Sequence, residues 1–472
     1  MNFMHQPQIL YRQRNILLLV LLIVTLLPLN GCLVGGKFHK PEVQTDAQYP
    51  QQTAPSDSIT NIQWFELYRD SVLQGFIKLT LDSNRDMLTA AARIEEAKQI
   101  LGFVKSNFYP QLGYGFSAGY GTAGSEARQL GNLEGGSVNL YGTLDWEIDL
   151  WGKVRHQKKS AQAKMLAEVE NRNALMVSLV AQTAESYFIL RDLDNRLQIA
   201  QRTVTSRQEN TRIITERFDK GYTSELDKMQ AIQQESIAAS QIPNLQRQIV
   251  YTENALRTLM GMRPGTVVRG LSNYDQTFVP EIPAGLPSQL LERRPDIREA
   301  EKRLESQFNQ IGVAKARMFP SISLTGLLGV ASPAFATLMT GGGFLANGIA
   351  GIFGPLFQFN KNRRLKKAEE FKTQQTLYQY EQTILEAFAD VDNSLAGYRT
   401  YNEEYDILKK QVEASRKALE LSQARYDFGY TDYTEVIIQQ TNLFDAELQE
   451  SFTLQRKLNS TVTLYRSLGG GW

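Results

Sequence analysis

Few residues in this chain of 472 could carry out catalytic or metal chemistry. The sequence has one Cys and three His, His5, His39 and His156, so neither an intrachain disulfide nor a histidine-built metal centre is expected. The 51 basic and 50 acidic residues nearly cancel, which argues against nucleic acid as the main partner. We therefore expect no cofactor, no bound metal and no nucleic acid.

Two short glycine motifs look catalytic but fall in the wrong context. Residues 115–119 match the nucleophile-elbow pattern, and residues 119–124 match a dinucleotide-binding pattern. Both lie in an alternating segment or its turn, and neither opens a helix, as the chemistry of each motif requires. We therefore expect that the protein is not an enzyme.

The single Cys follows a segment with the pattern of an export signal. Arg12 and Arg14 precede an apolar run of 12 residues, 16–27, which is too short to span a bilayer as a helix. The next residues, Leu29-Asn30-Gly31-Cys32, resemble the bacterial lipobox, in which the Cys thiol is alkylated by diacylglycerol after cleavage. We predict a signal peptide over 1–31 and lipidation of Cys32. The alternative is a cleaved secretory signal that leaves a Cys nearby.

Comparison of the chain with itself reveals a duplication. At an offset of 210, the Phe-Tyr-Pro that ends at Pro110 aligns with the Met-Phe-Pro that ends at Pro320. At an offset of 208, residues 217–223 align with residues 425–431. Each half reads as a helix, two strands, a very long helix, a glycine turn and another helix. The predicted domains are the signal 1–31, a lipidated tether 32–60, a first repeat 61–261, a crossover linker 262–287 and a second repeat 288–472.

Four segments alternate between apolar residues and polar or small ones. Aromatic residues such as Tyr114 lie on the apolar side, and carboxylates such as Asp145 lie on the other, which is typical of a transmembrane β-barrel. A soluble sandwich with one solvated face gives the same alternation, but the lipobox favours the barrel. The fourth segment alternates poorly and contains Pro355. The predicted strands are about 110–121, 137–150, 320–331 and 346–357.

Four strands cannot close a barrel, and unpaired strand edges are not tolerated in lipid, so the pattern implies an oligomer. Eight strands from a dimer would enclose an interior filled by side chains, whereas twelve strands from a trimer would leave a lumen.

The two longest predicted helices set the size of the remaining structure. They run from Lys153 to about Phe218 and from Lys361 to about Tyr426, contain no Pro, and would each reach roughly 100 Å. Their apolar stripes are interrupted by Gln, Thr and Ser, which favours helices packed around a wide, wet interior. A coiled-coil rod is the alternative, but it does not explain the strands or the export signal.

The start of the second repeat carries a specific resemblance. Residues 290–301, Leu-Leu-Glu-Arg-Arg-Pro-Asp-Ile-Arg-Glu-Ala-Glu, with Arg294, Pro295 and Asp296 at the centre, resemble a signature of the TolC-like outer-membrane efflux proteins. The branch is that of lipoproteins serving resistance-nodulation-division (RND) pumps, and the resemblance covers essentially the whole mature chain. It implies a mainly α-helical homotrimer with a twelve-stranded outer-membrane barrel, four strands coming from each chain. A periplasmic α-helical barrel would complete a passive exit duct, partnered by a periplasmic adaptor and an inner-membrane pump and anchored to outer-membrane lipid through Cys32.

The same resemblance implies a gate at the periplasmic end. In the family, acidic residues after each glycine turn ring the constriction, and a turn aromatic helps to hold it closed. The matching residues are Asp227 and Glu435 with the aromatics Tyr426 and Phe218, and the turn glycines are Gly221 and Gly429. The alternative is that both acids only cap helices, because each stands three residues after a Ser or Asp at a helix start.

Two further functions remain compatible with the sequence. The chain could be the outer component of a type I protein secretion system, or a lipid-anchored coiled-coil spacer that conducts nothing. The sequence does not indicate which substrate would pass through a duct.

Overall fold

The computed structural model describes residues 33–42, 50, 63–121, 135–277, 287–338 and 343–470. The chain divides into two compact units. The first unit comprises Met1–Lys40, Glu96–Met165 and Lys302–Leu377, and the second comprises Pro41–Glu95, Leu166–Glu301 and Tyr378–Trp472. Within the described parts of the chain, no helix is both long and apolar enough to cross a membrane.

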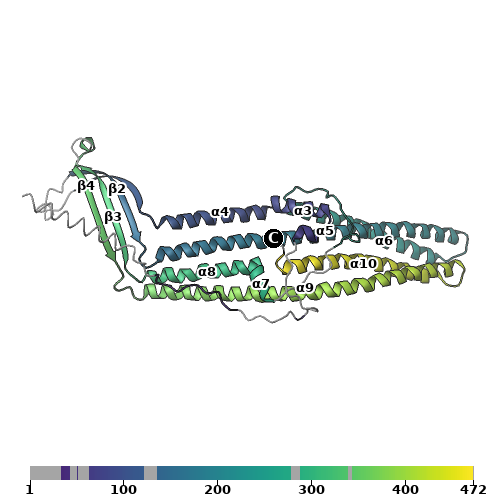
Figure 1. Cartoon of the computed structure of the whole chain (residues 1–472). Coiled ribbons are helices and arrows are strands. Elements are labelled where there is room, and N and C mark those ends of the chain that lie inside the picture. Colours follow the sequence, from purple (N-terminus) through teal and green to yellow (C-terminus); the bar gives the residue numbers. More distant parts are fainter. Residues whose placement is uncertain are drawn as a thin grey trace, which may run out of the picture. The chain divides into compact units, whose positions relative to one another are not determined.

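The first unit holds one antiparallel sheet of four strands in the order β1-β2-β3-β4 (Figure 1). The central ladder joins the two repeats, since β2 pairs with β3 from Val138 opposite Ser332 to Ile148 opposite Ile322. The sheet is therefore a shared product of both halves. The strands are β1 (Gln111–Gly121), β2 (Gly135–Ile148), β3 (Ser321–Ser332) and β4 (Gly343–Phe353).

The register of the sheet gathers the apolar side chains on one face. Residues opposite one another in an antiparallel ladder share a face, so Leu112 and Leu144, which are partners, lie on the same side as Tyr114. Tyr114 is 93% exposed within the chain, and Ile352 on the far strand is 71% exposed. A protomer thus presents an apolar sheet face that its own chain leaves open, as expected of strands that face lipid.

The fourth strand differs most from its predicted span. It begins at Gly343 and ends at Phe353, four residues before the predicted end, because Pro355 has no N–H to contribute to the ladder. Apolar and polar residues alternate poorly along β4, as the sequence indicated, because Leu345 and Ile349 lie on the face opposite the apolar one.

The helices repeat in two matching series. In the first repeat α3, α4, β1, β2, α5 and α6 follow one another, and in the second α7, α8, β3, β4, α9 and α10 do so. The long helices α5 and α9 have 67 residues each, and α6 and α10 have 35 each. The predicted order is confirmed from the helix directly before the strands onward, and each repeat has one more helix ahead of it, α3 or α7. The bounds are α2 (Trp64–Leu67), α3 (Ser71–Ser83), α4 (Arg85–Ser106), α5 (Lys153–Asp219), α6 (Glu225–Leu259), α7 (Pro287–Arg293), α8 (Pro295–Ala316), η2 (Phe335–Thr337), α9 (Lys361–Asp427) and α10 (Tyr433–Ser467).

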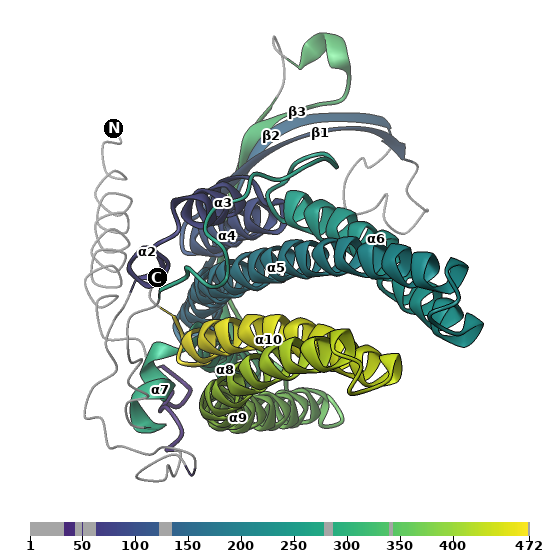
Figure 2. The same cartoon turned by 90° about the vertical axis from the view of Figure 1, so that its right-hand side faces the viewer.

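The core of the second unit lies between helices rather than under a sheet. The stripe expected on α5 is buried at Tyr187, where it packs with Phe188, with Ile77 of α3 and with Leu458 and Val462 of α10. Figure 2 shows α10 lying beside both α5 and α9. The packing ties together helices that come from both repeats.

A buried carboxylate fastens the crossover linker to this core. Asp70 is 2% exposed and caps α3 by accepting from the N–H of Val72 at 2.9 Å. It also accepts from the Tyr187 hydroxyl at 2.6 Å and from the N–H of Leu271, in the linker, at 2.9 Å. Burial alone would raise the pKa of Asp70, but the hydrogen bonds from Tyr187, Gln276 and the two N–H groups outweigh it and lower the pKa.

Replacing Asp70 by Asn should remove a stabilisation that depends on pH. A carboxylate with a lowered folded pKa stabilises the fold above its unfolded pKa of about 3.9 and loses this contribution as the pH falls through the folded value. We expect Asp70→Asn to cost about 1 to 3 kcal/mol at pH 7, and less below pH 4. Thermal unfolding of the purified protein across this pH range measures both effects. Asp82→Asn, an exposed change on the same helix, is the control; equal losses at every pH in the Asp70 variant would contradict the assignment.

Candidate functional site

The two turns between long helices have nearly the same backbone. Gly221 has a φ of 76° and Gly429 a φ of 75°, which L side chains rarely adopt. A Cβ at either position would meet no atom within 4 Å, so the backbone conformation and not crowding requires glycine. In each turn the residue after the glycine donates its N–H to the carbonyl five residues earlier, at 2.8 Å. The turn glycines named from the sequence thus end α5 and α9.

Asp227 caps the helix that follows the first turn. Its N–H donates to the Ser224 hydroxyl at 3.1 Å, and its carboxylate accepts from the Ser224 N–H at 3.2 Å. The Thr223 hydroxyl donates to the same carboxylate at 2.5 Å. Partial burial would raise the pKa of Asp227, but these hydrogen bonds lower it, so the group is held in its charged form. The capping box expected from the sequence is present here.

Glu435 occupies the equivalent place after the second turn, but its carboxylate is held differently. Its N–H donates to Asp432 at 3.3 Å, while its carboxylate accepts from the Thr431 hydroxyl at 2.5 Å. The Arg425 guanidinium lies 4.0 Å from the same carboxylate, at the outer limit of an ion pair. The contact with the turn threonine is the same in both hairpins, whereas Asp227 also accepts from the Ser224 N–H and Glu435 instead lies near Arg425 of α9.

The two turn aromatics do not act alike. Tyr426 is half-buried and packs against Tyr433 with ring centroids 5.4 Å apart, while the Arg217 guanidinium lies 5.1 Å from its ring. Phe218 instead lies 4.9 Å from Lys228 and stays within its own hairpin. Tyr426 takes part in a contact between the two hairpins, through Arg217.

Arg217 is the contact residue that the sequence did not single out. Besides Tyr426, it reaches the carboxylate of Asp427 at 3.7 Å, so a side chain of α5 holds the end of α9. The repeated Arg-aromatic-Asp sequence at 217–219 and 425–427 placed both residues in a turn, but gave no sign of which Arg crosses between hairpins.

The turns have weak, exposed polar contacts, and a buried apolar cluster lies next to them. Arg217 and Asp427 are 37% and 52% exposed, and exposed ion pairs of this kind contribute only about 0.2 to 1 kcal/mol. Directly below them α5, α6 and α10 share a buried cluster of Ile214, Ala231, Tyr433, Val436 and Ile437. The exposed contacts between the turns are therefore weaker than the buried apolar contacts next to them.

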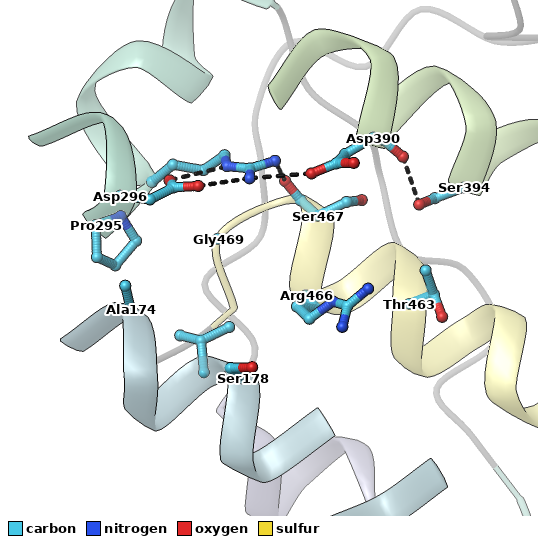
Figure 3. Close-up of a pocket in the computed structure, with 12 residues that line it drawn as sticks. Ala174, Ser178, Pro295, Asp296, Asp390, Ser394, Thr463, Arg466, Ser467 and Gly469 are labelled. Atoms are coloured by element: carbon cyan, nitrogen blue, oxygen red, sulfur yellow. Dashed lines mark hydrogen bonds and ion pairs between the residues drawn. The ribbon is translucent and has the colours of Figure 1, made fainter. Parts of the chain in front are cut away.

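The central residues of the signature motif form an ion-pair node elsewhere in the second unit (Figure 3). Arg294 donates to the Asp296 carboxylate from Nε at 3.0 Å and from Nη2 at 2.6 Å. Its Nη2 also donates to the Asp390 carboxylate, on α9, at 3.2 Å. Arg294 also donates to the carbonyl of Ser467 at the end of α10, at 3.2 Å. Pro295 starts α8, where its missing N–H costs nothing. The motif therefore joins three helices of the second repeat.

In the first repeat, an uncharged residue occupies the position equivalent to Arg294, between the two helices that precede the strands. Asn84 stands 210 positions before Arg294, between α3 and α4, and is buried. Its amide donates to the carbonyl of Leu259 at the end of α6, at 2.8 Å, and accepts from the N–H of Asp86 at 2.8 Å. The duplicated backbone thus keeps the junction while the side chain differs.

Cys32, the predicted lipid attachment point, lies outside the described residues, as does most of the predicted tether over 32–60. Its role stays a prediction.

The fold and these turns define a class of protein: a chain that gives four strands with an open apolar face and two long helical hairpins, each ending in a glycine turn. A sequence profile for the outer membrane efflux protein family matches residues 76–262 and 286–470, once in each repeat. The chain belongs to the outer membrane efflux protein family.

Individual relatives agree along nearly the full length. The chain is 29% identical over 465 residues to the probable efflux pump outer membrane protein TtgC of Pseudomonas putida, covering 96% of each. It is 29% identical to the cation efflux system protein CusC of Escherichia coli, covering 94% of this chain and 97% of that one. The solved outer-membrane channel OprN is 28% identical and superposes with a TM-score of 0.86 over 93% of this chain and all of that chain.

Membership confirms the family, fold class and compartment that the sequence implied. The chain is an outer-membrane exit channel protein for efflux, and the family's function is transport and not catalysis.

Arg294 should be a major contributor to the stability of the second repeat. Removing one partner of a well-bonded ion pair leaves the other charges and carbonyls unpaired, and we expect Arg294→Ala to cost about 2 to 4 kcal/mol. Arg294→Lys should recover little, because an ammonium cannot reproduce the two-nitrogen grip on Asp296. Unfolding in denaturant provides the measurement.

The matched control for this prediction is Arg212→Gln on α5, whose ion pairs with Glu209 and Glu216 are exposed. It should change stability by less than about 1 kcal/mol. Equal effects of the Arg294 and Arg212 variants would contradict a special role for the motif.

Proposed function

We propose that three copies of this chain form a gated duct, the outermost part of a tripartite efflux system of the RND class. An inner-membrane pump supplies the energy, a periplasmic adaptor links the pump to the duct, and small molecules pass through passively. The observation that carries the proposal is the open apolar sheet face of the protomer, with Tyr114 93% exposed. The duct itself needs no catalytic chemistry.

The number of copies follows from the sheet. The outer edges of β1 and β4 carry ladder groups that lipid cannot satisfy, so these edges must pair with other chains. Two copies would give eight strands and a filled interior, whereas three give twelve strands and a lumen. The trimer is therefore the smallest assembly that both pairs the edges and conducts.

The contacts between hairpins supply the gate. In this proposal Arg217 holds the end of α9 through Tyr426 and Asp427, and releasing it lets the hairpins move apart when the adaptor engages. Asp227 and Glu435 stand in the first turn of the following helices, where they combine helix capping with an acidic lining of the entrance. Three copies of Glu435 at the entrance would favour cations there.

Cargo is not specified by the duct in this proposal. The relatives named TtgC and CusC belong to systems described as an efflux pump and a cation efflux system, so closely similar channels serve different pumps. We assign small molecules to this chain because the RND-type resemblance outweighs the type I secretion alternative.

Conductance in planar bilayers tests both the duct and the proposed role of Arg217 in holding its end closed. We expect wild-type trimers to open rarely and Arg217→Gln to shift the closed-to-open ratio by about fivefold per protomer, since about 1 kcal/mol of ion-pair and cation–π contact is lost. Arg247→Gln, an exposed change on α6, should leave gating unchanged. Replacing Asp227 and Glu435 by Ala should reduce cation preference.

Two results would go against the proposal. Trimers that never conduct, even with Asp227 and Glu435 changed to Ala, would rule out a duct and favour the spacer. If the Arg217 and Arg247 variants conduct with equal gating, the duct proposal stands, but Arg217 does not hold the closed end.

Lipidation is tested at the only Cys in the sequence. Wild-type cells grown with labelled palmitate should incorporate the label into this protein, and Cys32→Ser should abolish incorporation because no other thiol is available. The mass of the mature amino terminus gives an independent measurement. An unlabelled wild-type protein, or cleavage at another residue, would show that the secretory-signal alternative is right, and label retained in Cys32→Ser would contradict attachment at Cys32.

A further inference from the structure

A cavity of about 390 Å³ lies among α5, α9 and α10 in the second unit. One part of its lining is basic, with Arg202 and Arg207 from α5 and Arg416 from α9. The other part is apolar, and its residues are Leu419, Leu443 and Phe444. Along α5, Arg207 stands 12 residues before the end of the helix, about 18 Å away, so the cavity is distinct from the turn contacts.

Arg207 is the most unusual residue of the lining. It is 3% exposed, its Nη1 donates to the carbonyl of Gln234 at 2.6 Å, and its guanidinium lies 5.3 Å from the ring of Phe444. Its Nε and Nη2 have no hydrogen-bond partner among the described residues. These two nitrogens form one edge of the guanidinium, and that edge matches the two oxygens of a carboxylate.

The other two arginines stand at the exposed side of the cavity. Arg202 and Arg416 are 65% and 62% exposed, and both pair with the nearly buried Glu447, at 2.8 and 3.0 Å. The lining therefore has three guanidinium groups and one carboxylate, an excess of positive charge. An anion entering the cavity would pass between two cations before reaching a third.

The surrounding charges leave Arg207 only partly compensated. Burial lowers the pKa of Arg207, and nearby Asp445 opposes this effect through space. Asp445 is exposed on α10 and acts on Arg207 through space, so an incoming anion would compete with it. Burying a charge with unmade hydrogen bonds is costly unless a partner of opposite charge supplies them.

We propose that this cavity binds a small organic carboxylate. The carboxylate accepts from Nε and Nη2 of Arg207, and a small apolar body packs against Leu419, Leu443 and Phe444. The ligand class follows from the two-part lining: an inorganic anion would leave the apolar wall unused, and a neutral apolar molecule would leave Arg207 unpaired. The inference goes beyond the proposed duct function and does not depend on the gate.

Titration of the purified, detergent-solubilised protein with benzoate tests the proposal directly. Isothermal calorimetry should detect saturable binding of one benzoate per chain. Benzyl alcohol, which has a similar shape and no charge, should bind at least about tenfold more weakly because it cannot take the bidentate contact. Equal binding of the two probes, or no binding of benzoate, would overturn the proposal.

Three variants connect the binding to the cavity. Arg207→Gln should weaken benzoate binding by about 10- to 100-fold, whereas Arg212→Gln, one turn further along α5, should leave it unchanged. Asp445→Asn should strengthen binding several-fold, because it removes the competing carboxylate. Arg416→Gln should weaken it by a smaller factor, because this residue lies at the exposed side.

If Arg207→Gln fails to fold, the Asp445 and Arg416 variants decide the matter alone. Opposite shifts of benzoate affinity in these two variants support the site. No shift in either one overturns it, as does equal binding by the Arg207 and Arg212 variants where both fold. None of these outcomes bears on bilayer conductance, so the inference and the duct proposal fail independently.

Discussion

The rest of the structure depends on one constraint: a backbone N–H or C=O facing lipid must find a hydrogen-bond partner. In the sheet, β2 and β3 meet this requirement for each other, which ties the two repeats into one surface. The edges of β1 and β4 cannot meet it within one chain. Self-association, and with it a passage through the assembly, follows from unsatisfied backbone groups more directly than from any particular side chain.

Burial also separates strong contacts from weak ones among the helices. Asp70 and Arg294 are held by several short hydrogen bonds in largely buried places, and such networks are costly to break. The link from Arg217 to Asp427 is longer and exposed, so water competes with it effectively. A channel needs both kinds of contact, because its walls must stay rigid while its end changes. The distribution of burial along the hairpins provides this difference.

Duplication gave the two halves one backbone and then let their side chains diverge. Asn84 and Arg294 support equivalent helix junctions in the two repeats, one through an amide and the other through a guanidinium group. Arg217 crosses between hairpins, whereas its counterpart Arg425 lies near Glu435 in its own hairpin. Glycine could not diverge at positions 221 and 429, because the left-handed backbone of each turn excludes most other residues.

The sequence by itself determined the elements and their order, because alternation of period two, helices free of proline and glycine turns are local properties of the chain. It also located Asp227 in a capping box, since that motif spans four consecutive residues. Only the tertiary structure decided that Arg217 reaches α9, and that Arg207 is buried with an unpaired edge and lines a cavity. These outcomes depend on side chains from helices distant in sequence, and no spacing along the chain encodes which of them meet.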